Sequence, residues 1–326
     1  MKVSLAPMAG YTDSAFRRIA GEMGADYAVS EMISAVALVM KDEKTASLAK
    51  IGEGEPPVVL QIFGHDPDTM AEAAEILLSG RYPGCSYAAP PAGIDINMGC
   101  PVKKIVSNGD GSALMLDPDR AARIVSRVKE VCARRSVPLS VKFRMGWDSL
   151  TAPEFARAVA DAGADRITLH CRTREEFYMP SAHPEAAGLV YEELKSEIGS
   201  GRLAFAGNGD VDSPQAAARY LAEGCTEVAV GRAALGDPWI FRRLKDPEGF
   251  VPPTLDEIRA AVIRLVEAVV REKGELRGVR ESRSRAACFI RGMRGSASVR
   301  DRLNHAETLA EFIEILSNGV TTASHL

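Results

Sequence analysis

The sequence lacks the features of membrane proteins and of proteins held together by metals or disulfides. No hydrophobic run approaches the ~20 residues that span a membrane, and the first residues contain no apolar signal-peptide core. The six cysteines are scattered and include no C-x-x-C pair, so we expect neither a disulfide framework nor a zinc site. These absences predict a cytoplasmic protein with no membrane partner and no bound metal, and a monomer is the default.

A strong overall positive charge is also absent. The net charge is −4, which argues against a protein that coats nucleic acid with its whole surface. The charge is uneven, because the segment 259–302 holds 12 Lys and Arg against 5 Asp and Glu. Nearly all of these cations are arginines, which are well suited to phosphate contacts. The segment predicts a local basic surface, although a solvated helical face has the same pattern.

Short apolar runs alternate with helical patterns over about 240 residues. The runs predict eight strands, at 3–8, 26–29, 57–62, 94–97, 139–143, 166–170, 203–206 and 227–230. Several helical patterns begin with a capping residue followed by proline, as at Asp66-Pro67 and Asp117-Pro118. This rhythm predicts an α/β fold, a (β/α)8 TIM barrel. A doubly wound sheet is the alternative, and it is disfavoured because no G-x-G-x-x-G follows the first strand.

Pro252-Pro253 marks a domain boundary. We predict a catalytic barrel over 1–245 and a small all-helical C-terminal domain over 253–326 that carries the basic segment. Helical patterns in this second domain cover 255–273, 281–291 and 307–317. Within the barrel, the Gly- and Pro-containing stretch 81–92 predicts an extra surface loop.

Polar residues follow nearly every predicted strand, at the rim where TIM barrels place their active sites. Cys100 is the most informative, because it lies in a Gly/Pro turn directly after a strand, close to Asn97. A cysteine used only for packing usually lies inside the apolar run. Each residue alone has an ordinary structural interpretation, but their convergence on one rim predicts an active site. The group comprises Gln61, Asn97, Cys100, Lys142, Arg144, His170, Arg172, Asn208, Asp210 and Arg232.

The residue types at this rim suit an anionic cofactor. Glycines and an arginine follow the last two strands, at 207–210 and 231–232, which is the usual phosphate position in TIM barrels. Lys142 can stabilise a negatively charged ring, Pro7-Met8 can supply an apolar platform, and Gln61 can bond a ring edge. This set suits a planar phosphorylated cofactor such as FMN, with Cys100 as proton donor. Composition alone does not distinguish FMN from a sugar phosphate.

The chain resembles the tRNA-dihydrouridine synthases, most closely the bacterial B-type branch. An ordered set of motifs over nearly the whole chain carries the resemblance. They lie at 6–13, 95–101, 141–144, 170–174, 207–210, 231–232, 237–241 and 292–297. The resemblance implies an FMN enzyme that uses NADPH to reduce uridines in the D-loop of tRNA. Hydride would pass from reduced flavin to C6 of uracil, and Cys100 would protonate C5.

The resemblance also implies roles for individual residues. Those around the flavin ring would be Pro7, Met8, Ala9, Gln61, Lys142 and His170. Those at its phosphate end would be Asn208, Gly209, Asp210, Gly231 and Arg232. Asn97 and Arg172 would contact the uracil, and Arg283 and Arg291 would contact the tRNA.

Two other functions stay open at this stage. A flavin-dependent reductase of a free pyrimidine would need no basic surface, and a non-catalytic RNA-binding protein would have a damaged cofactor site. The sequence also departs from the family pattern, at Cys171, at His183-Pro184 and, in the helical domain, at Arg285, Cys288 and Phe289. We expect these departures to affect how tRNA is held and to leave the chemistry at Cys100 unchanged.

Overall fold

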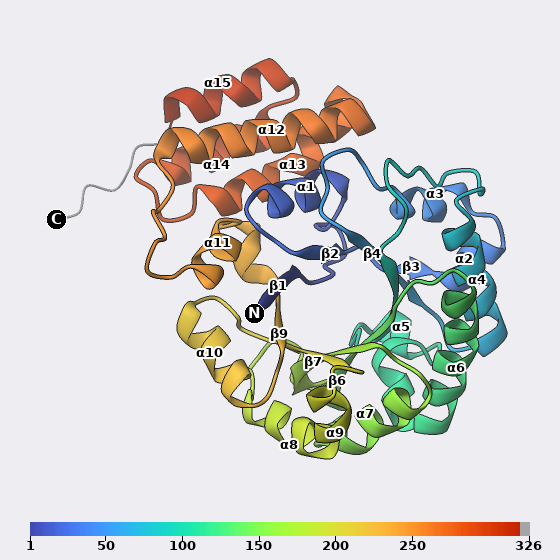
Figure 1. Cartoon of the computed structure of the whole chain (residues 1–326). Helices are drawn as coiled ribbons and strands as arrows, with labels where there is room; N and C mark the ends of the chain where they lie inside the picture. Colours follow the sequence, from blue (N-terminus) through green and yellow to red (C-terminus); the bar gives the residue numbers. More distant parts are fainter. Residues whose placement is uncertain (320–326) are drawn as a thin grey trace.

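The computed structural model describes residues 1–319 and shows a closed parallel barrel with a group of helices beside it (Figure 1). The last residues of the predicted helical domain, 320–326, lie outside the described part. Strand β1 pairs with both β2 and β9, and β2 also pairs with β4, so the sheet closes into a ring. The ring is formed by β1 (Lys2–Leu5), β2 (Tyr27–Val29), β4 (Val58–Phe63), β5 (Gly93–Met98), β6 (Leu139–Gly146), β7 (Arg166–Thr173), β8 (Ala204–Asn208) and β9 (Glu227–Val230).

This ring confirms the predicted TIM barrel, and each predicted run overlaps one of its strands. One short strand was not predicted: β3 (Ile33–Ser34) pairs with β4 at the edge of the ring. The helix that follows β3 is α2 (Ala35–Val39). Ser34 caps this helix by accepting a hydrogen bond from the Ala37 N–H at 3.3 Å.

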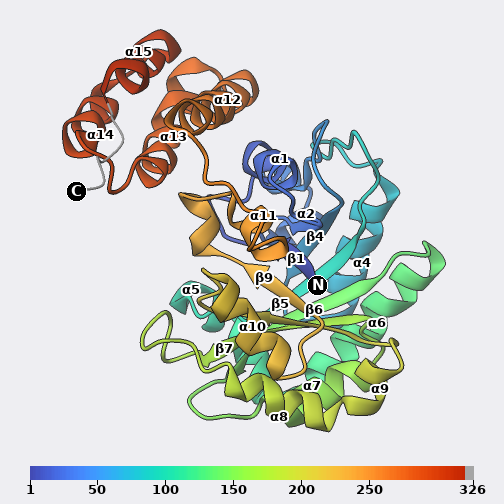
Figure 2. The same ribbon diagram turned by 60° about the vertical axis from the view of Figure 1, so that its left-hand side comes forward.

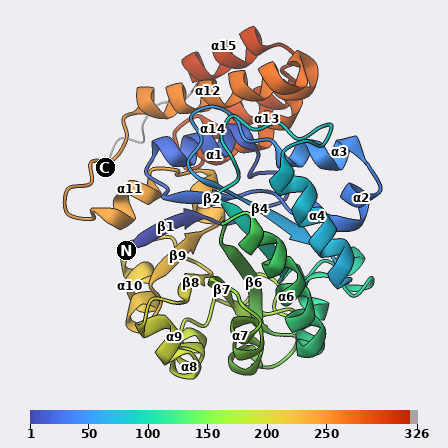
Figure 3. The same cartoon turned by 45° about the vertical axis from the view of Figure 1, so that its right-hand side comes forward.

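Helices surround the barrel and cover the apolar outer faces of its strands (Figures 1 and 3). At one such contact, the rings of Phe143 on β6 and Phe155 lie 5.2 Å apart. The capping residues Asp66, Asp117 and Ser213 each accept a backbone hydrogen bond and precede a proline in the first turn, as the sequence predicts. The remaining barrel helices are α1 (Ser14–Glu22), α3 (Glu43–Ala46), α4 (Pro67–Ser79), α5 (Lys103–Val106), α6 (Pro118–Arg134), α7 (Ala152–Asp161), α8 (Glu185–Glu193), α9 (Lys195–Gly199), α10 (Pro214–Ala222) and α11 (Ile240–Lys245), with 3-10 turns η1 (Ser47–Ala49), η2 (Gly111–Leu116) and η3 (Arg232–Leu235).

The C-terminal helices pack together beside α1 and α11 (Figures 1 and 2). They are α12 (Leu255–Lys273), α13 (Glu275–Phe289), α14 (Ser296–His305) and α15 (Leu309–Gly319). Helix α12 starts directly after Pro252-Pro253 with a capping box between Thr254 and Glu257. The helix predicted at 281–291 begins earlier, at Glu275, and α14 was not predicted.

The loop predicted at 81–92 packs against the outer segment that precedes β4. Tyr87 forms an isolated parallel bridge with Ile51, and its hydroxyl donates to the Leu77 carbonyl at 3.0 Å. Its contacts therefore lie away from the polar residues of the strand ends. Within residues 1–319, no helix combines the length and apolarity needed to cross a membrane.

Candidate active site

The predicted polar residues meet at the carboxyl ends of the strands. The strand register places Asn97 of β5 opposite Lys142 of β6, and His170 of β7 opposite Asn208 of β8. Asn97 Nδ2 donates to Gln61 Oε1 at 2.9 Å, and Lys142 Nζ donates to Asn208 Oδ1 at 3.0 Å. The side chains from β4, β5, β6 and β8 therefore lie together on one polar rim, as two hydrogen-bonded pairs.

A chain of hydrogen bonds leads from a buried carboxylate to the turn that carries Cys100. Asp95 accepts from Ser140 Oγ at 2.5 Å and from Gln61 Nε2 at 2.7 Å. Gln61 can then present only its oxygen to Asn97, and Asn97 presents its own oxygen to the Cys100 N–H at 2.9 Å. Because both oxygens of Asp95 accept in these bonds, Asp95 sets the direction of every bond in this chain.

Sequence reasoning missed Asp95. It is 2% exposed, and burial raises its pKa against the opposing effect of the Gln61 and Ser140 hydrogen bonds. One sequence signal was available: Asp95 precedes Asn97 by two residues in a strand, so both side chains lie on the same face.

The Cys100 side chain is half-buried at the rim. Burial raises the pKa of its thiol, although the nearby Arg144 charge opposes the shift. The thiol therefore keeps its proton at neutral pH. The Cys100 carbonyl accepts from Ser112 N at 3.1 Å and from Ser112 Oγ at 3.0 Å. Gly111 permits this close packing, since its φ is +61° and a Cβ there would lie 2.8 Å from the Cys100 carbonyl oxygen.

Lys142 is cationic and His170 neutral at the rim. Burial and the neighbouring Arg144 lower the pKa of Lys142 to about 8, and within residues 1–319 no carboxylate forms an ion pair with it. Burial, followed by the surrounding Lys142 and arginine charges, holds the pKa of His170 well below its usual value. Arg172 Nη1 donates to His170 Nε2 at 3.2 Å, which leaves the proton of the neutral ring on Nδ1.

Asp210 organises the predicted phosphate end of the site. Its carboxylate accepts from Arg232 Nη2 at 2.9 Å, from the Ala182 N–H at 3.0 Å and from the Arg172 guanidinium. Partial burial opposes ionisation, but the bonds from Ala182 and Arg172 lower the pKa of Asp210 below its usual value. Gly209 lies so close to Ala182 that a Cβ would meet the Ala182 Cβ at 2.8 Å. Asp210 thus holds Arg232 and the loop after β7 in place.

The loop after β1 lies next to the loop after β9. Pro7 and Met8 are half-buried, and Ala9 is exposed. If Gly231 carried a Cβ, the neighbouring heavy atom within 4 Å of it would be Met8 Sδ, at 3.8 Å. The predicted apolar platform and the predicted phosphate loop therefore border the same space.

Arg172 holds the loop that follows β7. It is 1% exposed, and its Nε donates to the Pro180 carbonyl at 2.7 Å. Since its other nitrogens bond His170 and Asp210, the guanidinium is fully engaged by protein. Contact between Arg172 and uracil stays a prediction, and the geometry gives this residue a positioning role. Arg144 acts similarly, donating to the Gly99 and Thr173 carbonyls at 2.8 Å each.

The three departures from the family pattern in the barrel, at Cys171, His183 and Pro184, have packing explanations. Cys171 is buried on the outer side of β7, and burial raises its pKa to about 12. His183 bonds Glu176 at 2.9 Å, and its N–H donates to the Cys171 carbonyl at 2.8 Å. Pro184 immediately precedes α8. These residues shape the base of the loop after β7.

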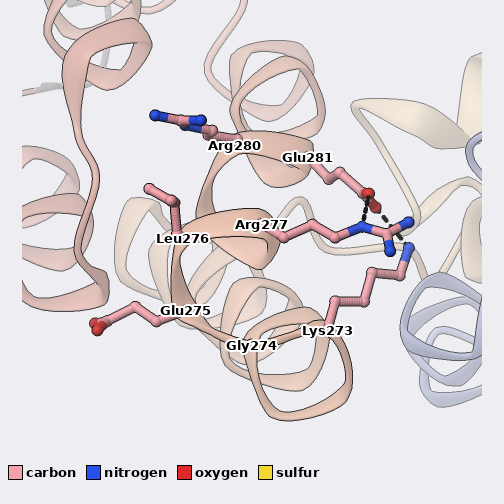
Figure 4. A pocket seen from close by; sticks show the side chains of 7 residues that line it. All are labelled: Lys273, Gly274, Glu275, Leu276, Arg277, Arg280 and Glu281. Atoms are coloured by element: carbon pink, nitrogen blue, oxygen red, sulfur yellow. Dashed lines mark hydrogen bonds and ion pairs between the residues drawn. The ribbon is translucent and has the colours of Figure 1, made fainter.

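The two arginines predicted to contact tRNA occupy different environments. Arg283 is half-buried and donates to the Ala306 carbonyl, which ties α13 to the end of α14. Arg291 is exposed and has no polar partner within residues 1–319. A hollow of about 440 Å³ lies at the turn between α12 and α13. There Lys273 and Arg277 point toward Glu281, which they bond at 2.6 and 2.7 Å (Figure 4).

The family comparison decides the class of this site. The family model described as dihydrouridine synthase (Dus) matches residues 4–324. The chain belongs to the dihydrouridine synthase family. This membership confirms the resemblance stated from the sequence, and the chain is an enzyme of that class.

Individual relatives agree with the assignment. A tRNA-dihydrouridine synthase B from Xanthomonas axonopodis is 38% identical over 316 residues, covering 94% of this chain and 89% of the relative. A probable tRNA-dihydrouridine synthase from Treponema pallidum is 34% identical over 322 residues, covering 96% and 92%. The solved structure of DHODH from Eimeria tenella with ferulenol is 15% identical, with a TM-score of 0.51 over 82% of this chain and 84% of that one. At that identity the structural likeness shows the barrel fold alone.

Proposed function

We propose that this synthase uses FMN, with NADPH as reductant, to convert D-loop uridines of tRNA to 5,6-dihydrouridine. The observation that carries the proposal is the half-buried position of the Cys100 side chain on a rim where Lys142 forms no ion pair with a carboxylate of the described residues. In this proposal the barrel, residues 1–245, performs the chemistry, and the helical domain, residues 253–326, holds the RNA.

The residues of the rim fit FMN. Lys142, Arg144, Arg172 and Arg232 face a region in which Asp210 is the carboxylate that pairs with two of them. This excess of positive charge suits a phosphate and an anionic ring. Arg232 is well placed for the phosphate, because its side chain is 52% exposed and Asp210 fixes one of its nitrogens. Neutral His170 can donate from Nδ1 to a ring acceptor.

The chemistry divides between the cofactor and the chain. When bound, reduced FMN supplies the hydride for C6 of uracil. Cys100 gives its Sγ proton to C5, a role that requires the neutral thiol produced by burial. Asn97, whose orientation is set through Gln61 by Asp95, holds the Cys100 turn and would bond the uracil edge.

The surroundings of the rim suit an RNA substrate. A uridine in folded tRNA must leave its stack to reach a barrel mouth. The tip of the loop after β7 exposes Phe177, Tyr178 and Met179, and the Tyr178 ring lies 4.7 Å from the Arg232 guanidinium. Exposed aromatic rings bind unstacked bases. Exposed arginines of the helical domain whose side chains have no polar partner within residues 1–319, among them Arg291, then attract the RNA backbone.

The test is incubation of the purified protein with FMN, NADPH and an unmodified tRNA transcript, followed by position-resolved mass spectrometry of the nucleosides. We expect dihydrouridine at one or more D-loop positions. Reduction of free uracil or orotate with no change in tRNA would instead assign a free-pyrimidine reductase. Binding of tRNA without any reduction would assign a non-catalytic RNA-binding protein.

A further inference from the structure

Helix α13 of the C-terminal group touches both barrel loops that border the proposed cofactor site. At its C-terminal end it meets the segment after β9: the Phe289 ring contacts Trp239 edge-on at 6.4 Å. A Cβ on Gly236 would lie 2.5 Å from the Cys288 carbonyl oxygen. One turn earlier, Arg285 reaches the loop after β1 and donates to the Gly10 carbonyl at 2.9 Å. A single helix thus joins the two loops that begin at Met8 and Gly231.

Arg285 is buried in this contact, at 5% exposed. Besides Gly10, its guanidinium pairs with Asp13 through Nη1 and Oδ2 at 2.8 Å, and this second contact is electrostatic and not an aligned hydrogen bond. A buried guanidinium is strongly destabilising without partners. The packing of α13 on the barrel therefore requires the loop after β1 to present the Gly10 carbonyl and the Asp13 carboxylate.

The same loop is held from its other side by the barrel. The Gly10 N–H donates to Glu31, which follows β2, so the two backbone groups of Gly10 have one partner in the barrel and one in the C-terminal helices. Asp13 also caps α1 by accepting from the Phe16 N–H at 3.1 Å. Lys273, at the end of α12, lies 3.6 Å from the Asp13 carboxylate. The conformation of residues 8–13 is thus fixed jointly by the barrel and by the C-terminal helices.

We propose that Arg285 is a positioning residue through which the helical domain sets the affinity of the barrel for FMN. The inference rests on the proposed function, in which Pro7, Met8 and Ala9 line the flavin. Without Arg285 the loop loses one of the two anchors at Gly10 and samples other conformations, so FMN must order it on binding. The three departures at Arg285, Cys288 and Phe289 then lie at the contact with the barrel and not on a surface facing RNA.

The direct test measures FMN dissociation constants for the apoprotein by quenching of flavin fluorescence. Arg285→Met should raise the constant about tenfold, the loss of roughly one hydrogen bond to a charged group. The matched control is Arg280→Met on the same helix, whose guanidinium is exposed and pairs with Glu307 at 2.8 Å. The control should change the constant less than about twofold. Equal constants for wild type and Arg285→Met would overturn the inference.

A double-mutant cycle separates this pairing from general damage to the fold. Asp13→Asn removes the charge that faces Arg285 but keeps a residue that caps helices well. If Arg285→Met does not fold, this variant tests the same contact from the barrel side. Each single change should raise the FMN dissociation constant. The double variant should have a constant no higher than that of the more weakly binding single variant. Arg285→Lys should recover part of the affinity. Fully additive effects would refute coupling through this pair.

The outcomes also distinguish this inference from the proposed function. If the wild-type apoprotein does not bind FMN, the proposed cofactor is wrong. If it binds FMN and the Arg285 variants bind equally well, only the positioning role fails. Affinity for tRNA, measured on the same proteins by filter binding, should change less than about twofold, since the exposed arginines stay in place.

Discussion

The arginines of the barrel rim and those of the helical domain show two uses of the same side chain. Arg144 and Arg172 are 2% and 1% exposed, and their nitrogens bond protein carbonyls, His170 and Asp210. Arg291, Arg294 and Arg300 are exposed and have no polar partner within residues 1–319. Buried arginines fix geometry and are little affected by salt, whereas exposed ones act through attraction that salt screens.

The basic segment 259–302 contains arginines of both kinds, some paired within the protein and some exposed. Lys273 and Arg277 neutralise Glu281, and Arg280 pairs with Glu307. Other arginines of the segment serve the fold, as Arg283 does at the Ala306 carbonyl and Arg285 does at Gly10. Within residues 1–319, the exposed arginines of the segment that form no ion pair therefore lie mostly in and just before α14, whose place Figure 2 shows; Arg271 on α12 is a further one. Substitutions in the barrel rim and in the helical domain should therefore have different effects.

Cys100→Ala should produce the largest effect. Loss of the proton donor should slow uridine reduction about 10²- to 10⁴-fold, the usual contribution of a general acid. FMN binding should be retained, because the Cys100 contacts to Asn97 and Ser112 are made by its backbone. The measurement is single-turnover dihydrouridine formation alongside flavin absorbance. Unchanged turnover would remove Cys100 from the reaction.

Asp95→Asn should produce the second largest effect. The amide can donate as well as accept, so Gln61 and Asn97 are no longer held in one orientation. We expect kcat to fall about 10- to 100-fold, since a buried polar group that loses its partner costs ~1–3 kcal/mol. Ser140→Ala is the matched control, because it removes one bond and leaves the carboxylate facing Gln61. Equal losses in both variants would contradict a directing role for Asp95.

The sequence predicted the barrel and most of its rim because their signals are local. Strand-length apolar runs, capping residues before prolines and polar residues at strand ends are all readable in short windows. It could not reveal that Asp95 directs Gln61 and Asn97, since that role depends on strand register. The contact of Arg285 with Gly10 joins residues 275 positions apart, and no local pattern encodes it.

Helix α14 was missed for a different physical reason. It buries only Val299 and Leu303, one turn apart, within a segment otherwise rich in charge. Such a segment has a weak helical period and depends on packing against α13 and α15 for its stability. Two exposed arginines lie directly before α14, Arg291 and Arg294, and their side chains have no polar partner within residues 1–319.

Arg291→Glu combined with Arg294→Glu should weaken tRNA binding about five- to tenfold at low salt. It should also reduce the slope of log affinity against log salt concentration, because fewer counterions are released. FMN binding and the thermal midpoint should stay unchanged. Arg283→Glu is the contrasting variant: its side chain is half-buried at Ala306, so it should lower the thermal midpoint. An unchanged tRNA affinity in the double variant would identify the surface as merely solvated.

The smallest effect concerns the pH dependence of FMN binding. The pKa of Lys142 is about 8 in the apoprotein, so its ammonium is mostly charged at pH 7 and half charged at pH 8. FMN is anionic and favours the charged form, and its phosphate has passed its second pKa of about 6 by this range. The dissociation constant should therefore rise about twofold from pH 7 to pH 8.

Lys142 alone should account for this rise of the FMN dissociation constant with pH. His170 is already neutral at pH 7 and the Cys100 thiol is still protonated at pH 8, since the pKa of His170 is lowered and that of Cys100 is raised. Lys142→Met should bind FMN more weakly, and its dissociation constant should not change between pH 7 and pH 8. A slope that persists in Lys142→Met would assign the titration to another group. A dissociation constant that does not change with pH in the wild type would show that the charge of Lys142 does not face the cofactor. Arg232 would then be the rim residue whose charge attracts FMN.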